Sequence, residues 1–171
     1  MNNTLSILLL LVALLLSGCN NKPDNVPEIF SCTISVTNGS TPIADVFIVV
    51  APEVGGAEWS MSGTTNTNGI ATIRTSRLGW QGNGIPAGTY RVSLSKIPTV
   101  PEISAEEYQR LSAEEQEMYN NEQEKKREKL PREIPEYLSD FVLSPFQITV
   151  AKGQKNFLAV DVAGLPAKPK K

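Results

Sequence analysis

The chain has 171 residues, of which 16 are basic and 18 acidic, and its formal net charge is −2. This balance of charges excludes a strongly basic protein, so we expect no nucleic-acid partner. The sequence contains no histidine; this removes the commonest general base, the usual activator of a serine or cysteine nucleophile and the imidazole ligands of zinc, so we expect neither an enzyme nor a bound cofactor or metal.

The N-terminus begins with a short apolar segment from Leu5 to Leu16. As a helix it would be about 18 Å long at ~1.5 Å per residue, too short for the ~30 Å hydrocarbon layer of a membrane but suited to a secretory signal. Leu16-Ser17-Gly18-Cys19 resembles the lipobox of bacterial lipoproteins. The resemblance implies that residues 1–18 are a signal peptide and that a lipid on Cys19 anchors the protein to the membrane. The alternative is an uncleaved hydrophobic N-terminus, since residues 1–4 carry no Lys or Arg.

Residues 19–28 are polar and contain two prolines, which predicts an extended tether between the lipid and the fold. Asn20 stands where an Asp would resemble an inner-membrane retention signal, so we expect the outer membrane, facing the periplasm or the cell surface. Removing residues 1–18 from 171 leaves 153 residues, a length that suits one domain, which we place at residues 29–165.

Alternating apolar and polar residues predict a first strand at residues 30–37, with Phe30, Cys32, Ile34 and Val36 on its buried face. The second cysteine is then a buried, unreactive thiol without an intramolecular partner. Val46–Val50 is apolar on both faces and predicts a central strand. Residues 58–65 and 70–75 predict a hairpin, with Ala71 and Ile73 inward. Its turn, residues 66–69, contains two Asn and a Gly, but it lacks the acidic ligands of a calcium loop.

Residues 77–84 are rich in glycine and predict a loop, which does not precede a helix and so is not a phosphate-binding loop. The strand that follows has Tyr90, Val92 and Leu94 on one face. Three segments in this order, Gly39–Val46, Thr65–Ala71 and Pro86–Val92, resemble the carboxypeptidase regulatory-like domain. The resemblance covers about residues 29–96 and 143–162, and it implies a mainly β fold, a transthyretin-like (prealbumin-like) Greek-key β-sandwich of about seven strands, found in small bacterial lipoproteins.

A charged insertion, residues 102–144, departs from a minimal domain of that family. Ser104-Ala105-Glu106-Glu107 and Ser112-Ala113-Glu114-Glu115 each have the spacing of a capping box. They predict a helix from Ser104 to Lys129, either continuous or broken at Leu111-Ser112. Four of its residues, Tyr108, Leu111, Met118 and Tyr119, form a thin apolar stripe that we expect to be exposed and to contact a partner protein. The alternative is a solvated decoration of the sheet edge.

Residues 146–150 and 156–162 predict a closing hairpin, with Ile148 and Val150 facing Leu158, Val160 and Val162. The tail, residues 166–171, is basic and broken by prolines, and we expect it to be disordered.

These features predict a non-catalytic envelope lipoprotein that binds or spaces another component. Hydroxyisourate hydrolases, which resemble transthyretin, depend on histidine, and the paired glutamates of the predicted helix are more simply a solvated face than a glycosidase pair. The alternative function is a carbohydrate-binding module of the cell envelope, in which Trp59 or Trp80 would stack on a glycan. Both tryptophans could equally be core or lid residues.

Overall fold

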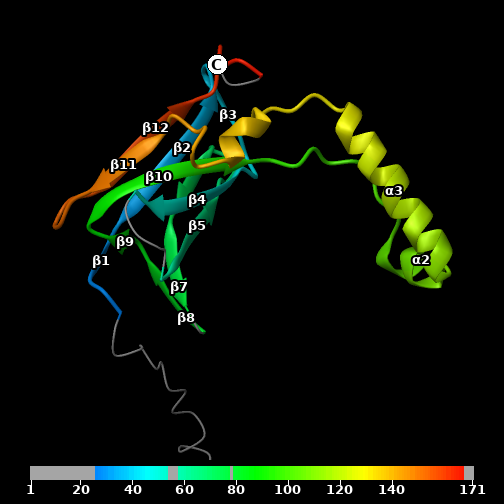
Figure 1. Cartoon of the computed structure of the whole chain (residues 1–171), viewed down its shortest axis with the longest axis horizontal. Helices are drawn as coiled ribbons and strands as arrows, with labels where there is room; N and C mark the ends of the chain where they lie inside the picture. The colour runs from blue at the N-terminus through cyan, green and yellow to red at the C-terminus, as the bar shows by residue number, and fades with distance from the viewer. Residues whose placement is uncertain (1–25, 54–57, 78, 168–171) are drawn as a thin grey trace, which may run out of the picture.

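The computed structural model describes residues 26–53, 58–77 and 79–167, and the fold is mainly β (Figure 1). The predicted signal peptide, Cys19, most of the predicted tether and residues 168–171 of the predicted tail lie outside the described residues. Over the described ranges, no helix is both long and apolar enough to cross a membrane.

Twelve short strands are described, more than the roughly seven expected. Their bounds are β1 Ile29–Phe30, β2 Cys32–Asn38, β3 Thr41–Pro42, β4 Phe47–Pro52, β5 Ser60–Thr64, β6 Ile70–Thr72, β7 Arg74–Arg77, β8 Trp80–Asn83, β9 Ile85–Pro86, β10 Gly88–Ser95, β11 Gln147–Val150 and β12 Asn156–Asp161. The helices are α2 Ala105–Arg110, α3 Ala113–Lys129 and the short 3₁₀ helix η1 Glu136–Ser139.

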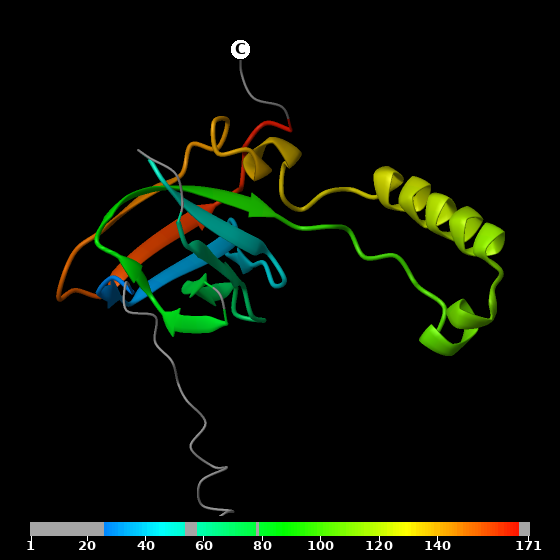
Figure 2. The ribbon, with the colours of Figure 1, turned by 60° about the horizontal axis from the view of Figure 1, so that its bottom comes forward.

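The strands form two larger sheets and one short pair. The first sheet has the order β11-β10-β4-β5-β7-β8, with every neighbouring pair antiparallel. In the second sheet, β2 pairs with β12 in parallel and with β3 and β6 in antiparallel fashion. β1 pairs with β9. The two larger sheets lie face to face, with β12 and β2 behind β10 and β4 in Figure 2.

One hydrophobic core lies between these sheets, because the strands alternate as the sequence predicts. β2 buries every second residue, and β10 buries Tyr90, Val92 and Leu94. Cys32 belongs to this core as a fully buried free thiol, so its predicted burial is confirmed. β4 is central, between β10 and β5, but it buries one face and leaves Phe47 exposed.

Thr65 secures the entry to β4 from inside the core. Its buried hydroxyl accepts a hydrogen bond from the Val46 amide (2.9 Å) and donates one to the Ile43 carbonyl (2.8 Å). The hydroxyl therefore acts both as a hydrogen-bond donor and as an acceptor. A buried polar group without such partners would destabilise the fold.

The predicted strand at residues 70–75 is divided. Its first part, β6, pairs with β2, and its second part, β7, pairs with β5, so the chain passes from one sheet to the other at Ile73. Ala71 and Ile73 are both buried, as predicted. The expectation of a glycine-rich loop at residues 77–84 is wrong in part, since Trp80–Asn83 form the edge strand β8. Gly82 permits this because a Cβ there would lie 2.6 Å from the Trp80 ring.

The prediction of a closing hairpin is also wrong, because its two strands form but do not pair with each other. β11 pairs with β10 and β12 pairs with β2, so the two strands lie in opposite sheets. Asn156 supports the crossing, because its side-chain amide donates to the carbonyls of Ser31, Ala151 and Gln154 and its Oδ1 accepts from the Ala151 amide. Ile148, Val150, Val160 and Val162 still share the core, but they meet across it rather than along one ladder.

Candidate functional site

A helical arm, residues 97–133, projects from the sandwich between β10 and η1 (Figures 1 and 2). Two irregular limbs connect it to the sheet, one before α2 and one after α3. The insertion predicted at residues 102–144 is therefore too long at its C-terminal end, because Ile134 and Leu138 are buried in the sandwich core. The arm is the most prominent departure from a plain sandwich and the first candidate for a binding role.

Two capping boxes divide the arm into two helices. Ser104 caps α2, and Ser112 caps α3; in each case the serine hydroxyl accepts from the third amide while the glutamate accepts from the serine amide. Leu111 is extended between the helices. Of the two alternatives left open, a continuous helix and a helix broken at Leu111-Ser112, the structure shows the broken one, since the second cap competes with continuation of the first helix.

The same hydrogen bonds lower the pKa of two glutamates. The Glu107 carboxylate has its pKa held below the ordinary value by the backbone amide and then the hydroxyl of Ser104, and Glu115 is affected likewise by Ser112. Each carboxylate also lies in the first turn of its helix, where negative charge is favoured.

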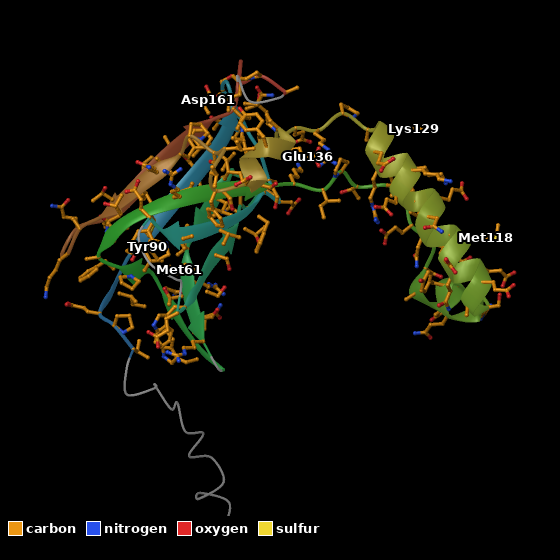
Figure 3. All side chains as sticks on the ribbon, viewed as in Figure 1. Met61, Tyr90, Met118, Lys129, Glu136 and Asp161 are labelled. Atoms are coloured by element: carbon orange, nitrogen blue, oxygen red, sulfur yellow. The ribbon has the colours of Figure 1, made fainter. Side chains whose placement is uncertain are left out.

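The four predicted partner-binding residues do not form one exposed stripe. Tyr108 and Tyr119 contact each other edge to face, with ring centroids 5.7 Å apart. The Asn120 amide donates to the Tyr108 hydroxyl, and the Tyr119 hydroxyl accepts from the Ile103 amide. These tyrosines and Leu111 are half-buried, whereas Met118 is 72% exposed at the outer end of the arm (Figure 3). Met118 precedes Tyr119 and so points about 100° away from it around the helix.

The face of α3 that turns inward is polar. Gln116, Tyr119, Gln123 and Arg127 follow one another at spacings of three or four residues and are the less exposed residues of this helix. Arg127 pairs with Glu102 across the arm at 2.6 Å, and Lys96 pairs with Glu133 at 2.8 Å. Polar contacts therefore hold the two limbs of the arm together.

A cleft of about 890 Å³ lies between the first limb, α3 and η1. Gln123 lines it and is 6% exposed. Among the described residues, the Oε1 atom of Gln123 is the one buried side-chain oxygen or nitrogen that has no hydrogen-bond partner. Such an unpaired acceptor costs about 1–3 kcal/mol. A search for apolar stripes misses this residue, although its position four residues after Tyr119 and four before Arg127 marks the inward face.

The two tryptophans lie together in the sandwich, Trp59 directly before β5 and Trp80 in β8. Trp59 and Trp80 meet edge to face at 5.7 Å, and the Arg77 guanidinium lies 5.0 Å from the Trp59 ring centroid and pairs with Glu58. Trp59 is 8% exposed, so it is a packing residue. Trp80 is half-buried.

The turn at residues 66–69 is organised by its own side chain. The Asn66 Oδ1 accepts from the amides of Asn68 and Ile70, which is an Asx turn. Within residues 26–53, 58–77 and 79–167, no group of three or more acidic, histidine or cysteine side chains could hold a metal ion.

No protein-family model matches the chain, and no curated protein matches it. Among solved structures, the chain is similar to the protein described as "Crystal structure of group B streptococcus pilus 2b backbone protein", at 12% sequence identity and a TM-score of 0.31. The match covers 84% of this chain and 45% of that one, so the chain spans less than half the length of that protein.

Proposed function

We propose that the protein is a non-catalytic lipoprotein of the bacterial envelope, anchored through lipid on Cys19, whose β-sandwich carries an arm that binds another envelope protein. The observation that carries the proposal is the arm itself. It is ordered by caps, ion pairs and a tyrosine contact, yet no residue of the arm belongs to the core cluster of the sandwich, and Val100 on the first limb is buried outside that cluster. An ordered, projecting segment without a packing role in its own domain is suited to recognition.

The sandwich in this proposal is a carboxypeptidase regulatory-like domain of transthyretin-like fold. Contacts between the motif residues support it. Thr65, which opens the second motif, binds Ile43 and Val46 of the first, and the Tyr90 hydroxyl donates to the Pro86 carbonyl within the third at 2.9 Å. The first two motifs therefore act together at the entry to β4, and the third organises the entry to β10 by itself.

Deletion of the arm tests the recognition role. Residues 102–133 are replaced by a short Gly-Ser linker in the full chain, and partners are captured by crosslinking in envelope preparations. We expect the variant to fold and to lose a specific crosslinked protein that the control Phe157→Ala, a change at an exposed sandwich position, retains. Retention of every partner by the shortened chain would contradict the role of the arm.

Replacement of the lipidated residue tests the anchor separately. Cys19→Ser should leave a full-length precursor that fatty acid does not label, because the thioether cannot form. Labelling of that variant would contradict the assignment, whereas Cys32→Ser serves as the control and should still be labelled.

A second candidate function is carbohydrate binding at Trp80, favoured by the incomplete burial of this residue. A glycan array with the full chain and with Trp80→Ala distinguishes it from the first. A saccharide signal that the substitution abolishes would favour this candidate.

A further inference from the structure

We propose that the cleft of the arm binds a lysine or arginine side chain carried by an extended segment of another polypeptide. The inference rests on the binding role proposed above for the arm, and it assigns the chemistry that this role requires. Four features of the cleft lead to it: an unpaired acceptor, uncompensated negative charge, aromatic walls and an unpaired backbone.

The unpaired acceptor is the Oε1 of Gln123. Its side chain lines the cleft from the inward face of α3, and the last torsion of a glutamine side chain is broad, so a half-turn exchanges the amide oxygen and nitrogen and presents the oxygen to the cleft. The oxygen requires a donor, and the ammonium of lysine or the guanidinium of arginine carries nothing but donors.

The charge around the cleft favours a cation. Four glutamates and two arginines line it. Arg127 pairs with Glu102 and Arg132 pairs with Glu136. Glu124 and Glu128, one turn apart on α3, make no ion pair with the described residues, which leaves a surplus of two negative charges at the rim.

The walls of the cleft suit the apolar stem of a basic side chain. Tyr108 and Tyr119 lie on one side and Ile97 and Ile103 on the limb. Long basic side chains place their methylene groups on such surfaces while the charged group reaches polar partners, and aromatic faces attract the cation.

A polypeptide is favoured over a small cation because the limb itself is extended and unpaired. Among the described residues, the backbone of residues 97–102 has no hydrogen-bond partner, and the cleft of about 890 Å³ has room for more than one side chain. An extended segment could pair with the carbonyls of this limb, as in strand addition at a sheet edge, although Pro98 and Pro101 remove two donors.

The experiment uses the full chain in a nonionic detergent and a fluorescent probe, acetyl-Ala-Lys-Ala-Lys-Ala-amide, followed by anisotropy at low and high salt. We expect binding that weakens with salt and is roughly tenfold weaker for the peptide with Gln in place of Lys. Glu124→Gln with Glu128→Gln should weaken binding about tenfold, whereas the control Glu117→Gln, the same change outside the cleft, should alter it less than about twofold.

Gln123→Leu separates binding from packing. It removes an unpaired buried oxygen, so we expect an unfolding midpoint that is unchanged or higher together with binding weakened about fivefold or more. Equal binding by the wild type, the double glutamate variant and Gln123→Leu would overturn the proposal. So would spermidine binding as tightly as the peptide and displacing it, since the occupant would then be a free polyamine. The peptide assay contains no envelope proteins. If the peptide fails to bind, the outcome of the arm-deletion experiment is therefore unaffected, and the two proposals can fail separately.

Discussion

The sandwich and the arm reach an ordered structure by opposite means. In the sandwich, strands far apart in the sequence bury apolar side chains in one core, so its order depends on non-local burial. In the arm, helices of 6 and 17 residues form around local caps and exposed ion pairs, each worth about 0–1 kcal/mol. Isolated helices shorter than ~12–15 residues are marginal in water, and α2 lies below this limit while α3, with 17 residues, exceeds it only slightly. The same chain therefore combines a stable scaffold with an appendage that is close to the limit of stability.

The largest effect should follow from truncation in the sandwich core. Ile34 is fully buried on β2, between Ala71 of β6 and Leu158 of β12. Ile34→Ala should lower the free energy of unfolding by about 2–5 kcal/mol, because it removes apolar contacts and leaves a cavity. Denaturant titration measures this, with Met118→Ala in the arm as a control that should change it by less than about 0.5 kcal/mol. Similar losses from both changes would show that the arm shares the core.

The next effect should come from the buried thiol of the sandwich. Burial raises the pKa of Cys32 to about 11, above the ordinary value of 9.0. Since the folded value is the higher one, the contribution to stability is complete below pH 9 and is lost as the pH rises towards 11, by about 2–3 kcal/mol in total.

Chemical unfolding across this window measures the loss, in a Cys19→Ser background where Cys32 is the remaining thiol. The reference Cys32→Val should show a flatter dependence on pH, because it has no thiol to ionise. Fast thiol labelling of the native protein at neutral pH would contradict the burial of Cys32.

A smaller and local effect is expected from loss of a helix cap in the arm. Ser112→Ala should cost about 1 kcal/mol of α3 stability, because the amide of Glu115 loses its acceptor. Hydrogen exchange should accelerate in the first turns of α3 and stay unchanged in β10 and β4, whereas Ser112→Asp should preserve protection. Faster exchange throughout the sandwich would mean that the two regions unfold together.

The smallest effect should appear on acidification. The pKa values of Glu107 and Glu115 lie below their ordinary value of 4.5 in the folded arm. Their contribution is therefore present above that value and lost as the pH falls through the lower folded values. Helical circular dichroism should decline below pH about 4.5. With Glu107→Gln and Glu115→Gln, whose amides still accept in a capping box, this part of the decline should disappear.

Local patterns in the sequence predict the elements of both regions well. Alternation predicts the buried faces of β2 and β10, and the Ser-x-x-Glu spacing predicts both capping boxes and the place where the helix could break, but not that it breaks. What these patterns do not contain is the choice of partner strand. β11 and β12 are as apolar and as close in sequence as a hairpin, but Asn156 binds the carbonyls that turn the chain into the other sheet. The segment at residues 70–77 also changes sheet, at Ile73, because β6 pairs with β2 and β7 pairs with β5. The local alternation of residues does not contain this choice of partners.

The candidate site is less accessible to sequence reasoning than the fold. Tyr108 and Tyr119 are recognisable as a pair of aromatic residues in a charged helix, and they do meet. Gln123 carries no compositional signal, because an amide on a helix is ordinarily exposed. Its burial depends on its surroundings in the folded arm, where it lines a cleft together with residues of the first limb, and this is a tertiary property. Met118, the most hydrophobic residue of the helix by type, is instead in solvent.

The parallel pairing of β2 and β12 determines when the protein can become native. Asn156 and Ser31, joined by a hydrogen bond, lie 125 positions apart in the chain, so the second sheet stays incomplete until the chain is available as far as β12, which ends at Asp161. Contacts of such separation fold slowly, on a scale of milliseconds to seconds, whereas short helices form within about a microsecond. α2 and α3 can therefore form and dissolve many times before the sheets close around the core. During that interval the apolar strands of both sheets are exposed to solvent, while the helices of the arm need no contact with them to form.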